Sequence, residues 1–263
     1  MKRKFQILFC IGLIALCSCT GSRNTSHQKK ITGTDRDVNE CIASAGYTWS
    51  EVQKNCIRLF EQGVRMEASD EKCCYLVFAK DSTEVEIFFS DGRQNEILNR
   101  KSLPKGGYVW NVKEEDAKNV RYANGKWCIE QRGMEIFSQA PNCNQLGTMV
   151  EQTFEGLLPA SDCQGIVYSL AIRHCKYSGD GIYALVKTYQ KADNGKDKSF
   201  SQIGRRFTLR GMEGKQDATV WQLRPDDRGE ILNFLVEDDS TILLLDQNIR
   251  IINSQLNYRL KKK

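Results

Sequence analysis

Residues 165–190 read GIVYSLAIRHCKYSGDGIYALVKTYQ, and this stretch decides the fold class. Apolar and polar side chains alternate on both sides of a Ser-Gly-Asp-Gly turn signal at residues 178–181. A period of two is typical of β-strands, and a glycine-rich turn between two such runs indicates an antiparallel pair. The stretch therefore predicts two neighbouring strands, over residues 165–174 and 182–190.

The same pattern extends along the chain in both directions from this pair. Further strands are predicted towards the C-terminus at residues 199–209, 218–223, 231–237, 241–246, 249–253 and 256–261. Earlier strands are predicted at residues 74–78, 84–88, 95–99, 108–112, 118–123 and 127–137. Short strands separated by Gly/Asp turns favour a mainly β fold with a small antiparallel barrel or sandwich. Side chains inside such a barrel either fill it or line a small cup.

Residues 37–64 mix helix and turn signals. Thr48 and Glu51 have the spacing of a capping box, which predicts a short helix from Trp49 to about Cys56. We therefore expect a smaller α+β module over residues 37–148, rich in β-strand, before a barrel over residues 149–263.

The N-terminus has the features of a secretion signal. Residues 2–4 are basic, and the apolar stretch 5–16 is shorter than the roughly 20 residues that a membrane-spanning helix needs. The stretch ends in Leu-Cys-Ser-Cys, which has the form of a lipobox whose last residue, Cys19, receives a lipid. The sequence thus predicts a lipoprotein signal peptide over residues 1–18.

Lipidation places the mature chain on a membrane. A bacterial lipoprotein carries several acyl chains such as palmitate, and two or more chains give stable anchoring. Residues 19–36 are polar and predict a flexible tether. Thr20 is not the Asp that retains lipoproteins at an inner membrane. We therefore expect a protein of the cell envelope, on the cell outer membrane.

Eight cysteines remain after the predicted signal and Cys19 are set aside. An even number in an oxidising compartment favours disulfide bonds. Cys41 and Cys56 are the best candidates for a local disulfide. Cys163 and Cys175 are a poor pair, because the extended strand between them separates their Cα atoms too far. The adjacent Cys73 and Cys74 point to opposite faces of a strand, so we expect them to have different partners.

The sequence from Gly156 to Ile166, GLLPASDCQGI, resembles the opening of the NlpE N-terminal domain, a family of copper-resistance and envelope-stress lipoproteins. That family reads G-x-L-P-C-A-D-C-x-G-I, followed by an alternating strand, a Gly turn and a strand ending in Tyr. The residues of this motif loop are Pro159, Asp162, Cys163 and Gly165. The resemblance covers residues 154–262 and implies a small antiparallel barrel related to lipocalins.

The chain departs from the family pattern at Ala160, where the first cysteine of a C-x-x-C motif is expected. Two converging thiolates suit a soft metal such as copper, so the departure weakens any copper site at this loop. Cys163, His174 and Cys175 remain as weak candidate metal ligands. No other cofactor is expected.

The sequence offers no catalytic signature, so we expect a protein that is not an enzyme. It contains two histidines, and no H-E-x-x-H, G-x-S-x-G or P-loop motif. The pairs Asp226-Asp227 and Asp238-Asp239 lie in turn-like segments, where Asp forms local backbone hydrogen bonds. The net charge of +5 and the absence of a concentrated basic face argue against nucleic acid as a partner.

The resemblance implies an envelope sensor or a metal-tolerance factor, with an envelope signalling protein as a partner. Two alternatives come from other classes of protein. One is a lipocalin-like carrier of a small apolar ligand, which requires an open barrel interior. The other is a structural interaction lipoprotein that binds partners through residues 37–145.

Overall fold

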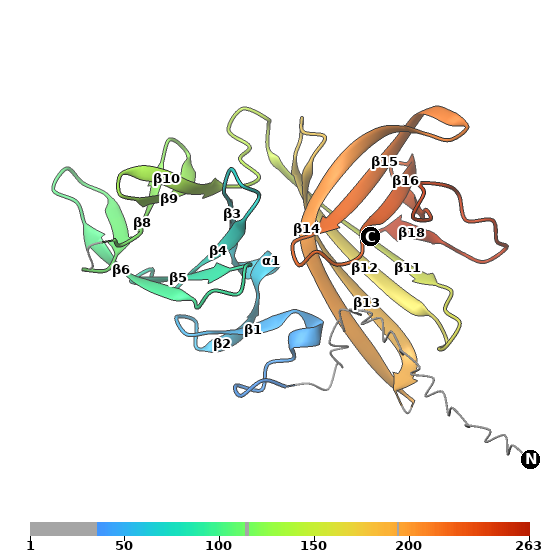
Figure 1. Ribbon diagram of the computed structural model, residues 1–263, viewed down its shortest axis with the longest axis horizontal. Helices are drawn as coiled ribbons and strands as arrows, with labels where there is room; N and C mark the ends of the chain where they lie inside the picture. The colour runs from blue at the N-terminus through green and yellow to red at the C-terminus, as the bar shows by residue number, and fades with distance from the viewer. Residues whose placement is uncertain (1–35, 114–115, 194) are drawn as a thin grey trace, which may run out of the picture. The chain divides into compact units, whose positions relative to one another are not determined.

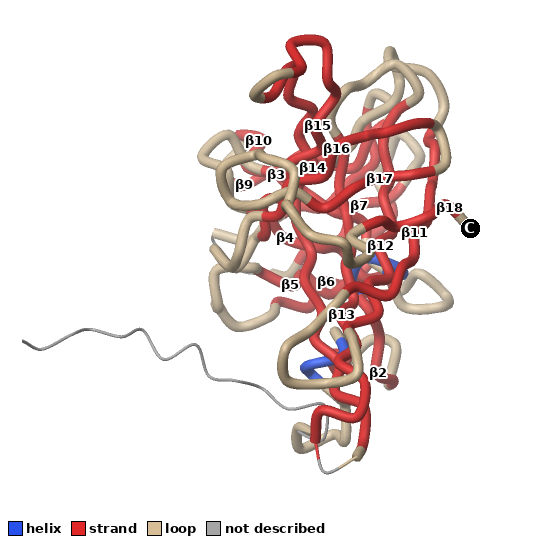
Figure 2. The backbone as a smooth tube through the Cα atoms, turned by 90° about the vertical axis from the view of Figure 1, so that its right-hand side faces the viewer, coloured by secondary structure: helices blue, strands red, loops and turns tan. Residues whose placement is uncertain are grey.

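The structure of the chain, a computed structural model, describes residues 36–113, 116–193 and 195–263. The expected signal peptide, Cys19 and residues 19–35 of the tether lie outside the described residues. The described chain is mainly β, with two closed eight-stranded antiparallel barrels and two short helices (Figure 2). The expected fold class is therefore confirmed, and the smaller N-terminal module contains a closed barrel of its own. Both barrels belong to one compact unit.

The C-terminal barrel, which we call barrel 2, is a simple meander in which each strand pairs with the next (Figure 1). Pairing between β11 and β18 closes it. Its strands are β11 (Met149–Leu158), β12 (Ile166–Cys175), β13 (Gly181–Asp193), β14 (Lys196–Met212), β15 (Lys215–Pro225), β16 (Leu232–Asp238), β17 (Thr241–Leu244) and β18 (Arg259–Lys262).

The interior of barrel 2 is filled by large side chains. Tyr168, Leu170 and Ile172 on β12 point inward, and Leu170 lies opposite Leu185 of β13. The remaining buried members of this core are Phe154, Leu158, Tyr183, Leu223, Leu232, Phe234, Ile242 and Leu260. Each buried apolar side chain of this size contributes about 1.5–3 kcal/mol, so this core is a large stabilising contribution to barrel 2.

The N-terminal barrel, which we call barrel 1, closes by pairing β10 with β3. Its core holds Leu76, Ile87, Ile129 and other buried side chains. Its strands are β3 (Val64–Glu67), β4 (Cys73–Phe78), β5 (Glu84–Phe89), β6 (Glu96–Ser102), β7 (Tyr108–Asn111), β8 (Asn119–Ala123), β9 (Lys126–Gln131) and β10 (Met134–Gln139).

A small hairpin precedes barrel 1 and packs on β5. It consists of β1 (Tyr47–Ser50) and β2 (Asn55–Arg58), after the 3-10 helix η1 (Ala43–Ala45). A disulfide joins Cys41 to Cys56, the pair that their spacing favours.

The predicted helix from Trp49 to Cys56 is wrong. These residues form the hairpin, and a short helix, α1, occurs only at Leu59–Gln62. The physical reason is the buried carboxylate of Glu86 on β5. Its Oε2 accepts hydrogen bonds from the Ser50 hydroxyl at 2.8 Å and the Glu51 backbone N–H at 2.9 Å, which fixes a turn there.

We expect Glu86→Gln to lower the free energy of unfolding by about 1–3 kcal/mol. Glu86 is 1% exposed, and its other oxygen accepts a bond from Asn95 at 2.9 Å. An amide group replaces one acceptor with a donor, so at least one buried donor loses its partner. Urea unfolding followed by circular dichroism measures the effect. Glu84→Gln, on the same strand, is the matched control, and equal stability of the two variants would contradict this role.

Two further strand predictions need correction. The single strand predicted over residues 127–137 is two strands, because Arg132 and Gly133 form a hairpin turn with positive φ angles of 51° and 77°. The strand predicted over residues 249–253 is reduced to one isolated bridge between Leu245 and Ile251. Ile249 has a φ of 60°, which interrupts extended backbone.

A second disulfide joins Cys143, between the two barrels in sequence, to Cys175 at the end of β12. Cys73, Cys74, Cys128 and Cys163 are free thiols, so the expected disulfide partners of Cys73 and Cys74 are not found among the described residues. In the described part of the chain, no helix is long and apolar enough to cross a membrane.

Candidate functional site

The motif loop connects β11 to β12 at one end of barrel 2. Its glycine, Gly165, has a φ of +148°, and an added Cβ would lie 2.7 Å from the side chain of Leu157. Only glycine adopts this conformation at low cost, which gives the family motif a structural reason here. Cys163 is half-buried, and its sulfur lies 3.3 Å from the Gly165 carbonyl oxygen.

The three candidate metal ligands do not converge. Cys175 is bonded to Cys143, which removes its sulfur as a thiolate ligand. The Nδ1 atom of His174 lies 2.9 Å from the Cys175 carbonyl oxygen. Cys163 precedes the strand that His174 nearly ends, about 30 Å away at the rise of an extended chain. Within the described ranges, no group of three or more His, Cys, Asp or Glu residues could hold a metal ion.

The most deeply buried ion pair among the described residues joins the two barrels. Arg65 on β3 donates to Asp226, just after β15, with its Nη2 atom 2.8 Å from Oδ1 and its Nη1 atom bonded to Oδ2. The side chains are 2% and 13% exposed. The hydroxyl of Tyr75 lies 2.9 Å from Arg65 Nη1. A bidentate pair of this kind fixes both position and angle.

Glu67 extends this pair into a chain of alternating charges. It accepts from Arg65 Nε at 2.9 Å, and it also lies 3.5 Å from Arg205 Nε on β14. We call Arg65, Glu67, Tyr75, Arg205 and Asp226 the junction network. Although burial opposes the charge of Arg65, the hydrogen bond to Asp226 and nearby negative charge raise its pKa above the ordinary value. Arg65 therefore remains charged at any physiological pH.

An apolar pocket of about 350 Å³ lies beside the junction network. Its walls come from the N-terminal hairpin, from barrel 1 and from barrel 2. The apolar wall includes Phe60, Tyr75, Phe88, Ala184, Val186 and Ile203, with Asp226 at its edge. Arg173 of β12 also donates to the Phe60 carbonyl oxygen and lies over the Phe60 ring, 4.6 Å from its centre. The pocket is therefore formed by residues of both barrels together.

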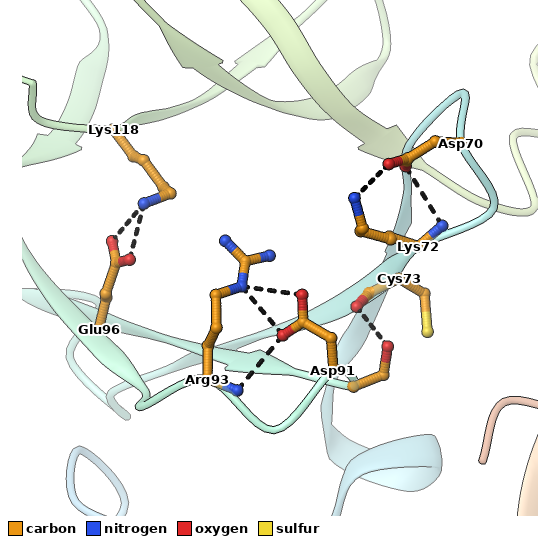
Figure 3. A network of polar contacts seen from close by, with 8 residues as sticks. Asp70, Lys72, Cys73, Asp91, Arg93, Glu96 and Lys118 are labelled. Atoms are coloured by element: carbon orange, nitrogen blue, oxygen red, sulfur yellow. Dashed lines mark hydrogen bonds and ion pairs between the residues drawn. The ribbon is translucent and has the colours of Figure 1, made fainter.

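A more polar cleft of about 560 Å³ lies on the other side of Asp226 and includes the rim of barrel 1. Figure 3 shows this rim, where Asp91 is paired with Arg93, Asp70 with Lys72, and Glu96 with Lys118. The Ser90 hydroxyl donates to the Cys73 carbonyl oxygen at 2.8 Å. Each carboxylate in this view thus has a basic partner within the rim.

Because two thiols are buried, we expect the free energy of unfolding to fall in alkaline solution. Burial raises the pKa of Cys73 to about 11, and it raises the pKa of Cys74 further. An unfolded cysteine has a pKa of about 8.5. Between pH 8 and 10 the unfolded state therefore loses thiol protons that the folded state keeps, and stability falls as pH rises.

We expect this loss to be about 1–2 kcal/mol for each thiol. The urea midpoint at pH 8 and pH 10, with a reducing agent present, measures it. Cys74→Ala should shrink the difference between the two pH values. A midpoint that does not change with pH in the unmodified protein would exclude this effect.

The closed meander of barrel 2 and the constrained glycine of its opening loop agree with a known family model. Residues 154–255 match the NlpE N-terminal domain. The match begins within β11 and runs beyond β17, so it covers most of barrel 2. Neither curated proteins nor solved structures gave a match to the chain. The resemblance seen in the sequence is thus confirmed for this part, and it supports an NlpE-like envelope protein. NlpE is not an enzyme family.

The sequence does not indicate the junction network. Asp226 lies in a turn-like segment, and no local pattern distinguishes Arg65 from other basic residues. The only local indication is the alternation of Val64, Arg65, Met66 and Glu67, which places the two charged residues on the face of β3 away from the barrel core.

Proposed function

We propose that this chain is a lipid-anchored protein of the bacterial envelope that acts as a sensor of envelope stress. The NlpE match over barrel 2 is the observation that carries the proposal. The lipobox ending at Cys19 and the two disulfides are both consistent with it, because disulfides persist in oxidising compartments. On this proposal the anchor holds the protein at the outer membrane, and an envelope signalling protein is its partner.

A conformational signal suits this chain better than metal storage. Ala160 removes one thiolate of the family motif, and Cys175 is tied in a disulfide. Copper tolerance would then follow from sensing rather than from a copper site at the motif loop. The junction network provides a place where such a signal can act, because breaking the Arg65–Asp226 pair frees the two barrels to move.

The carrier and interaction alternatives receive less support. A carrier of an apolar ligand needs an open barrel interior, whereas large buried side chains pack the interior of barrel 2. The apolar pocket that is observed lies outside that interior, between the hairpin and the two barrel walls. An interaction protein that uses only residues 37–145 would not need the family barrel.

Lipidation is tested by comparing Cys19→Ser with Cys17→Ser in the native host. With the anchor residue intact, the mature protein should incorporate labelled palmitate and sediment with membranes. Cys19→Ser should do neither, whereas the neighbouring Cys17→Ser should behave as the unmodified protein does. Equal labelling of both variants would contradict the anchor at Cys19.

Metal tolerance is tested separately, by growth of a strain that lacks the gene. If the protein contributes to copper tolerance, the deletion should lower the copper concentration that stops growth, and a plasmid copy should restore it. Unchanged copper tolerance would remove that part of the proposal and leave the sensor role to be judged on its own.

A further inference from the structure

Barrel 2 encloses a guanidinium group with two nitrogen atoms that no described residue hydrogen-bonds. Arg206 on β14 is 3% exposed, and its Nε and Nη2 atoms have no hydrogen-bond partner in the part of the chain that the structure describes. Its guanidinium carbon lies 4.8 Å from the centre of the Trp221 ring. A buried charge without a partner is strongly unfavourable, so such groups are normally paired.

The strand register places this group inside the barrel. Arg206 lies opposite Leu223 of β15, which belongs to the barrel core, and opposite Gly181 of β13. Two other side chains on inward positions also carry buried polar atoms without a partner among the described residues, the hydroxyl of Tyr183 and the Oε1 atom of Gln202. The wall of barrel 2 formed by β13 and β14 therefore carries hydrogen-bond donors and an acceptor that have no partner among the described residues.

The geometry of the unused atoms selects the ligand. Nε and Nη2 lie on the same edge of the guanidinium plane, and their parallel N–H bonds match two oxygens of a carboxylate or a phosphate. Trp221 covers a face of the plane, so a ligand would approach along this edge. Burial lowers the pKa of Arg206 to about 10, so it stays protonated at neutral pH.

The surroundings limit the size of the ligand and show where it could enter. Thr208, two residues further along β14, is exposed, as are Gly179 and Asp180 in the neighbouring turn. The Oδ1 atom of Asp180 already accepts a bond from the Thr208 backbone N–H at 3.1 Å. Arg206 thus lies just inside an exposed end of barrel 2, and the packed core beyond it leaves no place for a long acyl chain.

We propose that Arg206 anchors a binding site for a small oxyanion, a carboxylate or a phosphate, at this end of barrel 2. The site is separate from the motif loop, which lies at the other end of β12, and from the junction network. It does not depend on the sensor role.

Isothermal titration of the full chain in neutral detergent tests the proposal, with sodium acetate and sodium phosphate as separate probes. Sodium chloride at matched ionic strength provides the background. We expect saturable binding of at least one oxyanion and a higher unfolding temperature in its presence. Comparing the affinities for acetate and for phosphate shows whether the site prefers a carboxylate or a phosphate.

Three variants decide whether Arg206 is responsible. Arg206→Met keeps the length of the side chain and should weaken oxyanion binding by about tenfold or more, because two charge-assisted hydrogen bonds are lost. Arg206→Lys keeps the charge without the paired edge and should bind with intermediate affinity. Arg224→Met, an exposed arginine on β15, removes the same charge and should bind as the unmodified protein does.

Two results would overturn the proposal. One is the absence of saturable binding of acetate and of phosphate by the unmodified protein. The other is equal affinity of the unmodified protein and Arg206→Met. Because replacing an unpaired buried charge by methionine should not unfold the barrel, circular dichroism of that variant confirms that its fold is intact.

Discussion

Replacement of Arg65 by Met should destabilise the two-barrel unit by about 3–5 kcal/mol, the usual cost of removing one partner of a buried ion pair. The variant leaves the Asp226 carboxylate, 13% exposed, without its bidentate donor, and it leaves the Tyr75 hydroxyl without its guanidinium partner. It also removes the link between Glu67 and the rest of the network. Guanidinium chloride unfolding, followed by circular dichroism and by tryptophan fluorescence, measures the loss.

Two controls show whether the loss comes from the ion pair. Arg132→Met breaks an exposed pair with Asp116, where the side chains are 68% and 57% exposed, and it should change stability by less than about 1 kcal/mol. The double variant Arg65→Met with Asp226→Leu removes both charges and should recover part of the loss. An Arg65 variant as stable as the Arg132 variant would contradict the role of the junction network.

Removal of the Cys143–Cys175 disulfide should lower stability by about 3–4 kcal/mol in the chain-entropy model, since the bridge spans 32 residues. Cys143 lies in the segment between β10 and β11, so the bridge ties the connection between the barrels to the end of β12. Without the bridge, the unfolded chain gains conformational entropy and the native chain does not, so the unfolded state becomes more favourable.

The double variant Cys143→Ala with Cys175→Ala tests this in calorimetric unfolding. Its matched control is Cys41→Ala with Cys56→Ala, which opens a loop of 15 residues and should cost about 3 kcal/mol, slightly less. Adding a reducing agent should lower the unfolding temperature of the unmodified protein and leave that of a variant lacking both disulfides unchanged. An unaltered unfolding temperature after complete reduction would contradict a stabilising role for the disulfides.

The strands of barrel 2 could be predicted because local signals determine them. Between residues 165 and 190 the alternation has a period of two, and the turn carries two glycines. The match over residues 154–255 supports the same assignment. Strands of only four residues, such as β3, depend instead on pairing with distant strands, and no short stretch of sequence encodes that.

The positions of the important arginines could not be predicted for a related reason. On β14, Ile203, Phe207 and Leu209 make one face apolar, and Arg206 lies on the other face with Gly204. Alternation alone would direct the apolar face into the barrel. In the structure the apolar face points away from the barrel 2 core. Ile203 and Leu209 are partly buried and pack against clusters outside that core, and Arg206 is buried on the inner face.

The short helix was misplaced because a tertiary contact determines the structure there. Thr48 and Glu51 have helix-capping spacing, but the buried Glu86 carboxylate binds the backbone of Glu51 and the hydroxyl of Ser50. Glu86 is 35 residues away in sequence from Glu51, and no local pattern reveals that it faces the hairpin. The partner of Cys175 could not be predicted for a similar reason, since its bonding to Cys143 depends on the fold of the connecting segment.

Measuring envelope-stress transcripts in the native host tests the proposed NlpE-like sensor role most directly. The full chain is overproduced and compared with an unrelated lipoprotein carrying the same anchor, at equal abundance. We expect transcripts for envelope chaperones and proteases to rise with this chain and not with the control. No rise with this chain, or an equal rise with both, would contradict it.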